Sequence, residues 1–340
     1  MIAGPSNTTL RKRHLSIETI EGVKPLDAQF GIADPKTVPD VLYRPLFGQP
    51  ESTDADLEQI GGDPKKVLSL HTYAILDAAK ITGLPELLAA SRLEHRCLFK
   101  GDAYDELKDV APWIVRLKDG DGFTRYLFTH SNAEWHLWDK EPGIYRRSRG
   151  TLDDMWGHFR KFTKVKDEDG KWYYFRFWEC RPAIEYFTHV AVDAPKSQLW
   201  FPHHFEYMAA IIILPRSKTA SVFHSGIGDA EHSSKARYYL SRYEQQILSK
   251  QREIDFRTRL ISHLDRVSQS FQLRNDLQKV KYTKSLILTA RRYEIRIEQA
   301  VADFAAAAVL LGGPVETDPE CLAVLQSKKF GQVKKSQQAS

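Results

Sequence analysis

A stretch of 79 residues, from position 233 to position 311, contains neither proline nor glycine. Such a stretch favours long helices, because the two residues that most often end or kink a helix are missing. Apolar residues recur in it at helical spacing in two series, which are Leu240, Ile247, Ile254 and Ile261, and Phe256, Leu260, Leu264, Val267 and Phe271. The sequence therefore predicts an all-α lobe over residues 232–326, followed by a disordered basic tail over 327–340.

This lobe concentrates the positive charge of the chain. Residues 232–340 hold 19 basic and 11 acidic residues, although the net charge of all 340 residues is only +5. If residues 274–298 form one helix at 100° per residue, Leu286, Ile287, Ala290, Tyr293 and Ile297 share one face. The opposite face then carries six cations, namely Arg274, Lys281, Lys284, Arg291, Arg292 and Arg296. We predict that these six residues bind a partner.

Residues 67–231 alternate strand-like and helix-like patterns. A buried strand is predicted over 67–77, and helices are predicted over 84–90 and 151–160. Two hairpins are also expected, 112–117 with 123–128 and 162–165 with 172–178. The predicted fold class is therefore α+β, in which a mixed α/β domain with a sheet and helices precedes the all-α C-terminal lobe.

Aromatic residues crowd the last of these predicted strands. Because alternate strand residues face opposite sides, we expect Tyr173, Phe175 and Phe177 to pack against one layer of the core. Trp172, Tyr174 and Trp178 would then pack against the other layer. A stacking platform for single-stranded nucleic acid is the alternative interpretation of the same strand.

Residues 1–66 carry seven prolines, eight basic residues and ten acidic residues, with no sustained periodicity. Segments of this composition usually run over a surface or remain disordered. We therefore expect a partly disordered N-terminal extension, and a peptide arm that docks on a partner is the alternative.

Membrane and secretory classes are not indicated. The longest apolar runs, 208–215 and 300–311, are shorter than the roughly 18 residues that a membrane-spanning helix needs, and no signal-peptide pattern opens the sequence. Cys97, Cys180 and Cys321 are widely separated and form no Cys-x-x-Cys motif. We therefore expect a cytoplasmic protein that does not contact membranes.

Catalytic motifs are also missing from the sequence. It contains no phosphate-binding loop, no dinucleotide-binding glycine motif, no nucleophile elbow and no His-Glu-x-x-His. A metal would require three rings of the histidine cluster at 203, 204, 224 and 232 to converge, and Cys180 with His189 could be imagined as a thiolate and its base. We expect neither, and therefore predict a protein that is not an enzyme and that needs no metal or cofactor.

Five short motifs occur in an order that is similar to that of bacterial type VI secretion effector adaptors, also called effector chaperones. They are YAILDAA at 73–79, LFKG at 98–101, APWIV at 111–115, GIYRRS at 143–148 and FRFWECR at 175–181. The resemblance spans residues 67–190 and continues more weakly around 292–294, 298–300 and 304–312. In one departure, Cys180 stands between Glu179 and Arg181 where the family usually has proline, which changes the turn expected there.

The resemblance implies a cytoplasmic, non-catalytic adaptor or chaperone that binds a toxin effector and loads it onto the VgrG spike of the type VI secretion system. Its partners would be the toxin effector protein and the VgrG spike protein. The α/β domain would hold one partner and the basic helices the other, because complementary charge speeds association and adds selectivity. Five residues match family motifs, and for them we predict a mainly structural role: Asp77, Trp113, Arg176, Glu179 and Arg181.

Two other functions compete with this one. A nucleic-acid-binding protein could use the same basic helix, but the sequence contains no known reader motif, so nucleic acid is the less favoured partner. A hydrolase that uses Cys180 or the histidine cluster is the third hypothesis.

Overall fold

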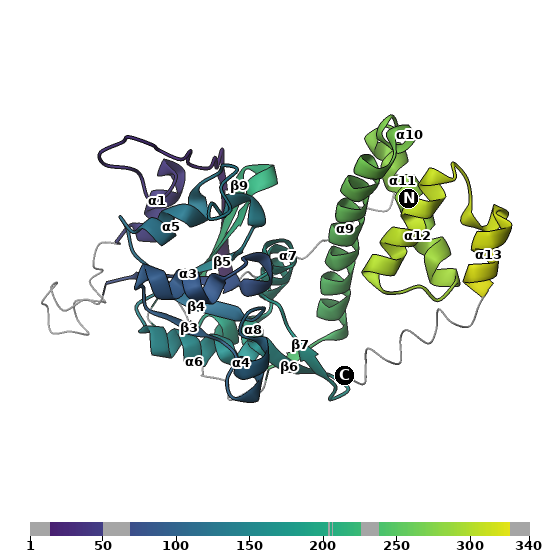
Figure 1. The fold of residues 1–340 in the computed structure, drawn as a ribbon. Coiled ribbons are helices and arrows are strands. Elements are labelled where there is room, and N and C mark those ends of the chain that lie inside the picture. Colours follow the sequence, from purple (N-terminus) through teal and green to yellow (C-terminus); the bar gives the residue numbers. More distant parts are fainter. Residues whose placement is uncertain (1–13, 50–68, 203–204, 206, 226–237, 327–340) are drawn as a thin grey trace, which may run out of the picture. The chain divides into compact units, whose positions relative to one another are not determined.

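The structure is a computed structural model, and it describes residues 14–49, 69–202, 205, 207–225 and 238–326. Two compact units divide the chain: unit 1 ends at Leu248 and unit 2 begins at Ser249. Unit 1 combines a seven-stranded sheet with helices, and unit 2 is helical (Figure 1). The predicted α+β fold class with a helical C-terminal region is thus confirmed.

The seven-stranded sheet of unit 1 has the strand order β1-β9-β8-β5-β2-β4-β3, and every neighbouring pair is antiparallel. Its strands are β1 (Leu15–Glu21), β2 (His71–Asp77), β3 (His95–Cys97), β4 (Pro112–Leu117), β5 (Gly143–Ser148), β8 (Met208–Leu214) and β9 (Thr219–Ser225). The strand predicted over 67–77 is β2, which lies between β4 and β5.

Helices cover both faces of this sheet. One core contains side chains from α1 (Asp40–Phe47), α3 (Leu84–Ser91) and α5 (Gly122–Phe128). The other core contains side chains from α6 (Leu152–Thr163), α7 (Cys180–Val190) and α8 (Ala194–Trp200). Along β2, Tyr73 and Ile75 belong to the second core, whereas Ala74 and Leu76 belong to the first. The central strand is therefore apolar on both faces, as its uninterrupted hydrophobic sequence indicates.

The predicted helices of unit 1 follow local signals in the sequence. In α6, the Thr151 hydroxyl accepts the backbone N–H of Asp154, and the Asp154 carboxylate accepts the backbone N–H of Thr151. This reciprocal capping box starts the helix at the predicted place. In α3, Gly83 has a left-handed backbone conformation immediately before the helix, and Pro85 lies in its first turn.

The N-terminal segment differs from the expected extension. Strand β1 pairs with β9 in the seven-stranded sheet, and the side chains of Leu15, Leu42 and Leu46 are buried. All prolines in this part follow β1: Pro25 and Pro35 lie before α1, Pro39 is its N-cap and Pro45 lies inside it, so none interrupts the strand. The residues of the extension that the structure describes, 14–49, are therefore part of the folded unit.

Of the first predicted hairpin, 112–117 with 123–128, only the first strand is present. Strand β4 forms as expected, but residues 122–128 form helix α5 instead of a second strand. The Asp121 carboxylate accepts the backbone N–H of Thr124 and caps this helix, and Phe123, Leu127 and Phe128 are buried on its inner face. The glycines of the connection suggested a hairpin turn, but the N-cap and the helical spacing of the apolar residues decide the outcome.

The second hairpin forms, but its second strand is short. Strand β6 (Lys164–Asp167) pairs with β7 (Trp172–Tyr174), and β10 (Tyr239–Leu240) completes a three-stranded sheet. Phe175, Phe177 and Trp178 lie beyond the strand and are buried in the core, as expected of core residues. Trp172 and Tyr174 are more than half exposed, so the expected two-sided burial of this strand is wrong.

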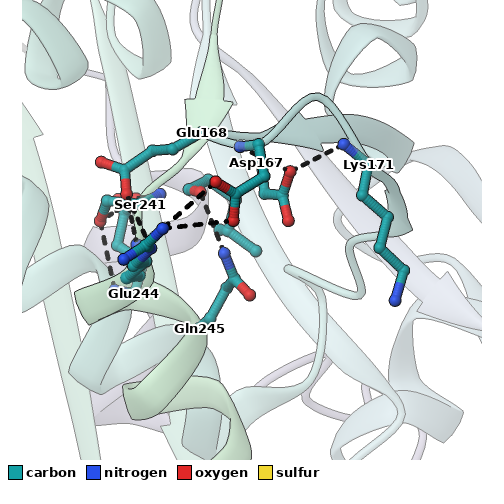
Figure 2. A network of polar contacts seen from close by, with 9 residues as sticks. Asp167, Glu168, Lys171, Ser241, Glu244 and Gln245 are labelled. Atoms are coloured by element: carbon teal, nitrogen blue, oxygen red, sulfur yellow. Dashed lines mark hydrogen bonds and ion pairs between the residues drawn. The ribbon is translucent and has the colours of Figure 1, made fainter.

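A polar network joins this hairpin to the start of helix α9 (Arg242–Val267), as Figure 2 shows. The Asp167 carboxylate accepts backbone N–H groups of Asp169 and Lys171 and closes the turn. The Glu244 carboxylate accepts the N–H and the hydroxyl of Ser241, and the ammonium of Lys196 pairs with it. The guanidinium of Arg242, in the first turn of α9, lies 3.2 Å from the Asp169 carboxylate and joins this helix to the hairpin. The first turn of α9 belongs to unit 1, which ends inside the helix at Leu248.

Unit 2 consists of the remainder of α9 with α10 (Gln269–Gln272), α11 (Asp276–Arg292), α12 (Glu298–Leu310) and α13 (Pro319–Gln326). Its core gathers Leu260, Leu264, Phe271, Ile287 and Phe304. Among the described helices, none is both long and apolar enough to cross a membrane.

The expected single helix over 274–298 is wrong. Helix α11 begins after Asn275, whose side chain accepts the backbone N–H of Gln278 in a capping box, and it ends at Arg292. Glu294 then takes a left-handed conformation, with φ of 61°, before α12 begins. Caps and one left-handed residue therefore divide a stretch in which no proline or glycine marks the boundaries.

Gly143 provides a test of the sheet. A Cβ atom added there would overlap the backbone of Ile75 on β2, whereas one added at Gly157, inside α6, would meet open space. We expect Gly143→Ala to lower the free energy of unfolding by at least about 2 kcal/mol, because the strands cannot separate without loss of pairing. Gly157→Ala should raise it by about 0.5–1 kcal/mol. Urea denaturation measures both, and equal stabilities would contradict the close approach of β2 and β5.

Candidate functional site

All six predicted cations are exposed, but they do not form one continuous helix face. Lys281, Lys284, Arg291 and Arg292 lie on α11. Arg274 precedes the helix and Arg296 follows it, because α11 is shorter than predicted. On the opposite face, Leu286, Ile287 and Ala290 are buried as expected, whereas Ile297 is exposed.

The six cations differ in whether a neighbouring side chain contacts them. The guanidinium of Arg291 lies 3.5 Å from the carboxylate of Glu253, and that of Arg274 lies 4.3 Å from the centre of the Tyr282 ring. In the described part of the chain, Lys281, Lys284, Arg292 and Arg296 form no ion pair. These four charges are therefore available to a partner.

Exposed leucines lie between these cations, and the charge count alone did not reveal them. Leu277 is 64% exposed and Leu288 is 48% exposed. They are 11 residues apart, so at 100° per residue they lie about 20° apart around α11, within the sector that holds Lys281 and Lys284. Such a mixture of apolar and basic side chains is typical of a protein-binding surface and not of a merely solvated helix face. We call Leu277, Lys281, Lys284, Leu288 and Arg292 the α11 face.

The acid and arginine of the family motifs meet at the end of β2. The Asp77 carboxylate is 1% exposed, accepts the backbone N–H of Ala79 at 3.1 Å, and lies 2.5 Å from the Arg176 guanidinium. Arg176 also lies 2.5 Å from the Glu179 carboxylate. Beside them, Arg181 lies 3.6 Å from the Glu141 carboxylate. Four of the five motif residues thus join two ion-pair clusters that connect β2, the 3₁₀ turn after it and the start of α7.

The GIYRRS motif on β5 supplies two buried arginines that the sequence did not mark as special. Arg147 donates to the carbonyl oxygens of Leu46 and Gly48, and so ties β5 to the end of α1. Arg146 points to the opposite face, donates to the carbonyl of Trp200 at 3.1 Å, and lies 4.6 Å from the centre of the Phe201 ring. Burial lowers the pKa of Arg146 to about 9 and that of Arg147 to about 10. Both arginines hold the fold together and do not face a partner.

Trp113, the fifth motif residue, takes no part in these ion pairs and lies opposite Cys97 of the edge strand β3. It belongs to β4, and its indole N–H donates to the carbonyl of Lys108 at 2.9 Å. Its ring helps to line a pocket of about 430 Å³ beside the edge strand β3. The remaining lining residues are His95, Arg96, Cys97, Phe99, Lys100, Gly101, Tyr104 and Trp156. We call this the edge pocket.

The structure keeps the two members of the imagined thiolate pair, Cys180 and His189, apart. Cys180 opens α7 and His189 is nine residues later in the same helix, which separates them by about 13 Å along its axis. The Cys180 thiol donates to the carbonyl of Gly143 at 3.2 Å, and burial raises its pKa to about 12. Three of the four clustered histidines, at 203, 204 and 232, lie outside the described residues, within which no group of three metal ligands occurs.

The ion pair of Asp77 predicts a stability effect. Asp77→Ala removes an acceptor from Ala79 and leaves Arg176 without its buried partner, so the free energy of unfolding should fall by about 2 kcal/mol. Asp153 is the matched control, because it pairs with Arg96 at 2.7 Å but is 82% exposed. Asp153→Ala should cost at most about 1 kcal/mol. Unchanged stability of the Asp77 variant in urea denaturation would show that the cluster is not structural.

The cysteines predict an order of chemical reactivity. Burial raises the pKa of Cys97 to about 11 and that of Cys180 to about 12, so near neutral pH both stay protonated and shielded. Iodoacetamide at about pH 8 should therefore label the half-buried Cys321 first. Mass spectrometry of the folded and the guanidinium-unfolded protein measures this order. Rapid labelling of Cys180 in the folded protein would restore the thiolate hypothesis.

Comparison with known proteins adds one match. Residues 72–193 match the model of a family described as Domain of unknown function (DUF4123), which is associated with effector adaptors of the type VI secretion system. Neither a curated protein nor a solved structure significantly matches the chain. The matched segment runs from β2 to the residue before α8 and contains the ion-pair clusters and Trp113, whereas the α11 face lies outside it. Residues 72–193 of unit 1 are thus similar to DUF4123.

Proposed function

We propose that this chain is a cytoplasmic adaptor that binds a toxin effector and loads it onto the VgrG spike of the type VI secretion system. The observation that carries the proposal is the match of residues 72–193 to a family associated with such adaptors. An adaptor needs two binding surfaces, and two compact units supply a physical basis for them.

The exposed side chains of α11 support a role of unit 2 in binding. The α11 face combines two exposed leucines with three cations that have no ion-pair partner in the described residues. Apolar contacts supply affinity, and the cations select an acidic partner and accelerate the encounter. We assign this face to one of the two partners.

The proposed mechanism is binding without catalysis or a cofactor. The thiol of Cys180 donates to the backbone carbonyl of Gly143, and burial raises its pKa to about 12. Asp77, Arg176 and Glu179 of the family motifs pair with one another at the end of β2, and Arg181 pairs with Glu141. These groups serve to hold a rigid scaffold on which exposed surfaces select partners.

Co-purification tests the adaptor function directly. The tagged full chain is expressed with a VgrG spike protein and a toxin effector from the bacterium that encodes it. Each partner is expected to co-purify with the chain, alone or as a ternary complex. If neither partner is retained, the adaptor function is wrong. Retention of an oligonucleotide near physiological salt, measured by filter binding, would instead support a nucleic-acid-binding protein.

Charge reversal tests the α11 face. Lys281→Glu combined with Lys284→Glu should weaken the association with one of the two partners by about tenfold or more, and the loss should shrink at high salt. The matched control combines Lys250→Glu with Arg252→Glu, two exposed cations of α9 in the same unit. Binding titrations of the purified variants measure both effects. Equal losses in the two variants would show that net charge, and not the α11 face, controls the association.

A further inference from the structure

The β6–β7 hairpin presents an outward face that the core does not use. Along β6, Val165 and Asp167 are buried while Lys164 and Lys166 are exposed. On β7, Trp172 and Tyr174 are each 55% exposed. The pairing places Lys164 opposite Tyr174 and Lys166 opposite Trp172, so all four side chains share one face. We call these four residues the hairpin face.

The two lysines of the hairpin face lie over its two rings. The ammonium of Lys164 is 5.3 Å from the centre of the Trp172 ring and 5.8 Å from that of Tyr174, and the ammonium of Lys166 is 5.0 Å from Trp172. Neither lysine forms an ion pair within the described residues. These cation–π contacts hold the lysines in place, and their N–H donors remain available.

The three acidic residues at 167–169, next to Lys166 in the sequence, do not pair with the lysines of the hairpin face. The Asp167 carboxylate accepts two backbone N–H groups inside the turn. Glu168 and Asp169 lie within 4.0 Å and 3.2 Å of the Arg242 guanidinium (Figure 2). The same contacts fix the hairpin to the start of α9, so the hairpin face is both positive and held in position.

The hairpin face continues into the edge pocket. The ring of Phe99, which lines the pocket, lies 6.0 Å from the ring of Tyr174. Three further aromatic rings, those of Tyr104, Trp113 and Trp156, line the pocket. The Arg96 guanidinium lies 3.6 Å from the centre of the Trp156 ring, and Lys100 is exposed at the pocket. A volume of about 430 Å³ falls in the range of pockets that hold one large side chain or a small ligand.

The way a ligand enters this pocket is restricted. The carbonyl of Cys97 on the edge strand β3 already accepts the indole N–H of Trp156 at 2.7 Å. A partner strand at that position would have to share this oxygen with Trp156, which disfavours extension of the sheet there and favours entry of a side chain into the pocket. Aromatic walls favour an aromatic side chain, which gains area and ring contacts there.

The positions of the lysines favour a peptide over a nucleic acid. A nucleobase would need a free ring face on Trp172 or Tyr174 for stacking, and lysine ammonium groups occupy positions over both rings. Carboxylates of a peptide can instead bind the ammonium groups where they already lie.

We propose that the hairpin face and the edge pocket together bind a linear acidic segment of a partner protein, with one aromatic side chain of that segment in the pocket. The proposal rests on the adaptor function and names the chemistry that unit 1 recognises in an adaptor's partner. The acidic residues contact Lys164 and Lys166, and the aromatic residue contacts Tyr104, Trp113 and Trp156.

Synthetic probes test this proposal with the full chain. Fluorescence anisotropy follows three labelled ligands: a peptide of aspartate, glutamate and serine with one central tryptophan, the same peptide with alanine at that place, and an oligothymidylate of equal charge. The tryptophan peptide is expected to bind saturably at low salt, at least about tenfold more tightly than the alanine peptide and the oligonucleotide.

Variants of exposed residues then test the hairpin face and the edge pocket individually. Lys164→Glu with Lys166→Glu should weaken both acidic peptides by about tenfold or more, whereas Tyr104→Ala should weaken only the tryptophan peptide. Trp172→Ala should weaken both peptides, and its matched control, Trp135→Ala, removes a tryptophan that is 53% exposed elsewhere in unit 1 and should change neither. Circular dichroism verifies that each variant is folded.

Three results would overturn the proposal. The first is equal affinity for the two peptides, and the second is peptide binding that neither the lysine variant nor the Tyr104 variant weakens. The third is binding of the oligonucleotide that is tighter than that of the peptides and is lost in the lysine variant. Because the peptides are synthetic, these results leave co-purification with the spike and toxin unaffected. A failure of the docking surface can therefore be distinguished from a failure of the adaptor function.

Discussion

The burial of both faces of the antiparallel sheet is the constraint on which unit 1 depends. Strand β2 is apolar on both faces, and β5 approaches it so closely at Gly143 that no side chain fits between them. The buried arginines of β5 extend from opposite faces and connect the sheet to the segments that cover it. Because both faces are occupied, a partner can reach the sheet only at its edges, its strand ends and its attached hairpin.

This arrangement separates charges that hold the fold from charges that can bind a partner. Asp77 and Arg176 lie next to each other at the end of β2, where burial makes the pair structurally important. By contrast, Lys164 and Lys166 on the hairpin and Lys281 and Lys284 on α11 have no ion-pair partner among the described residues. In both places the free cations stand beside exposed apolar or aromatic side chains, and the proposed binding of partners rests on this combination.

Sequence patterns predicted the elements that carry strong local signals. The continuous apolar run of β2 and the capping box of α6 were recognisable, and so was the mainly structural character of the aromatic residues after β7. Helix α5 was not predicted, because the glycines before it resemble a hairpin turn and its cap is a single aspartate. The breaks around α11 were missed because the Asn275 cap before the helix and the left-handed Glu294 after it, and not proline or glycine, produce them.

The sequence by itself determined the fold class, the concentration of positive charge in the C-terminal third and the absence of common catalytic motifs, since each depends on composition or local periodicity. Only the tertiary structure decided which charged and aromatic side chains are exposed and available to a partner. Trp172 belongs to the same short strand as the half-buried Tyr173, yet pairing with β6 leaves it exposed beside two lysines. Likewise, Phe99 and Tyr174 are 75 positions apart and meet only because the hairpin packs beside the edge of the sheet. Contacts between distant segments are set by packing, which local sequence patterns do not encode.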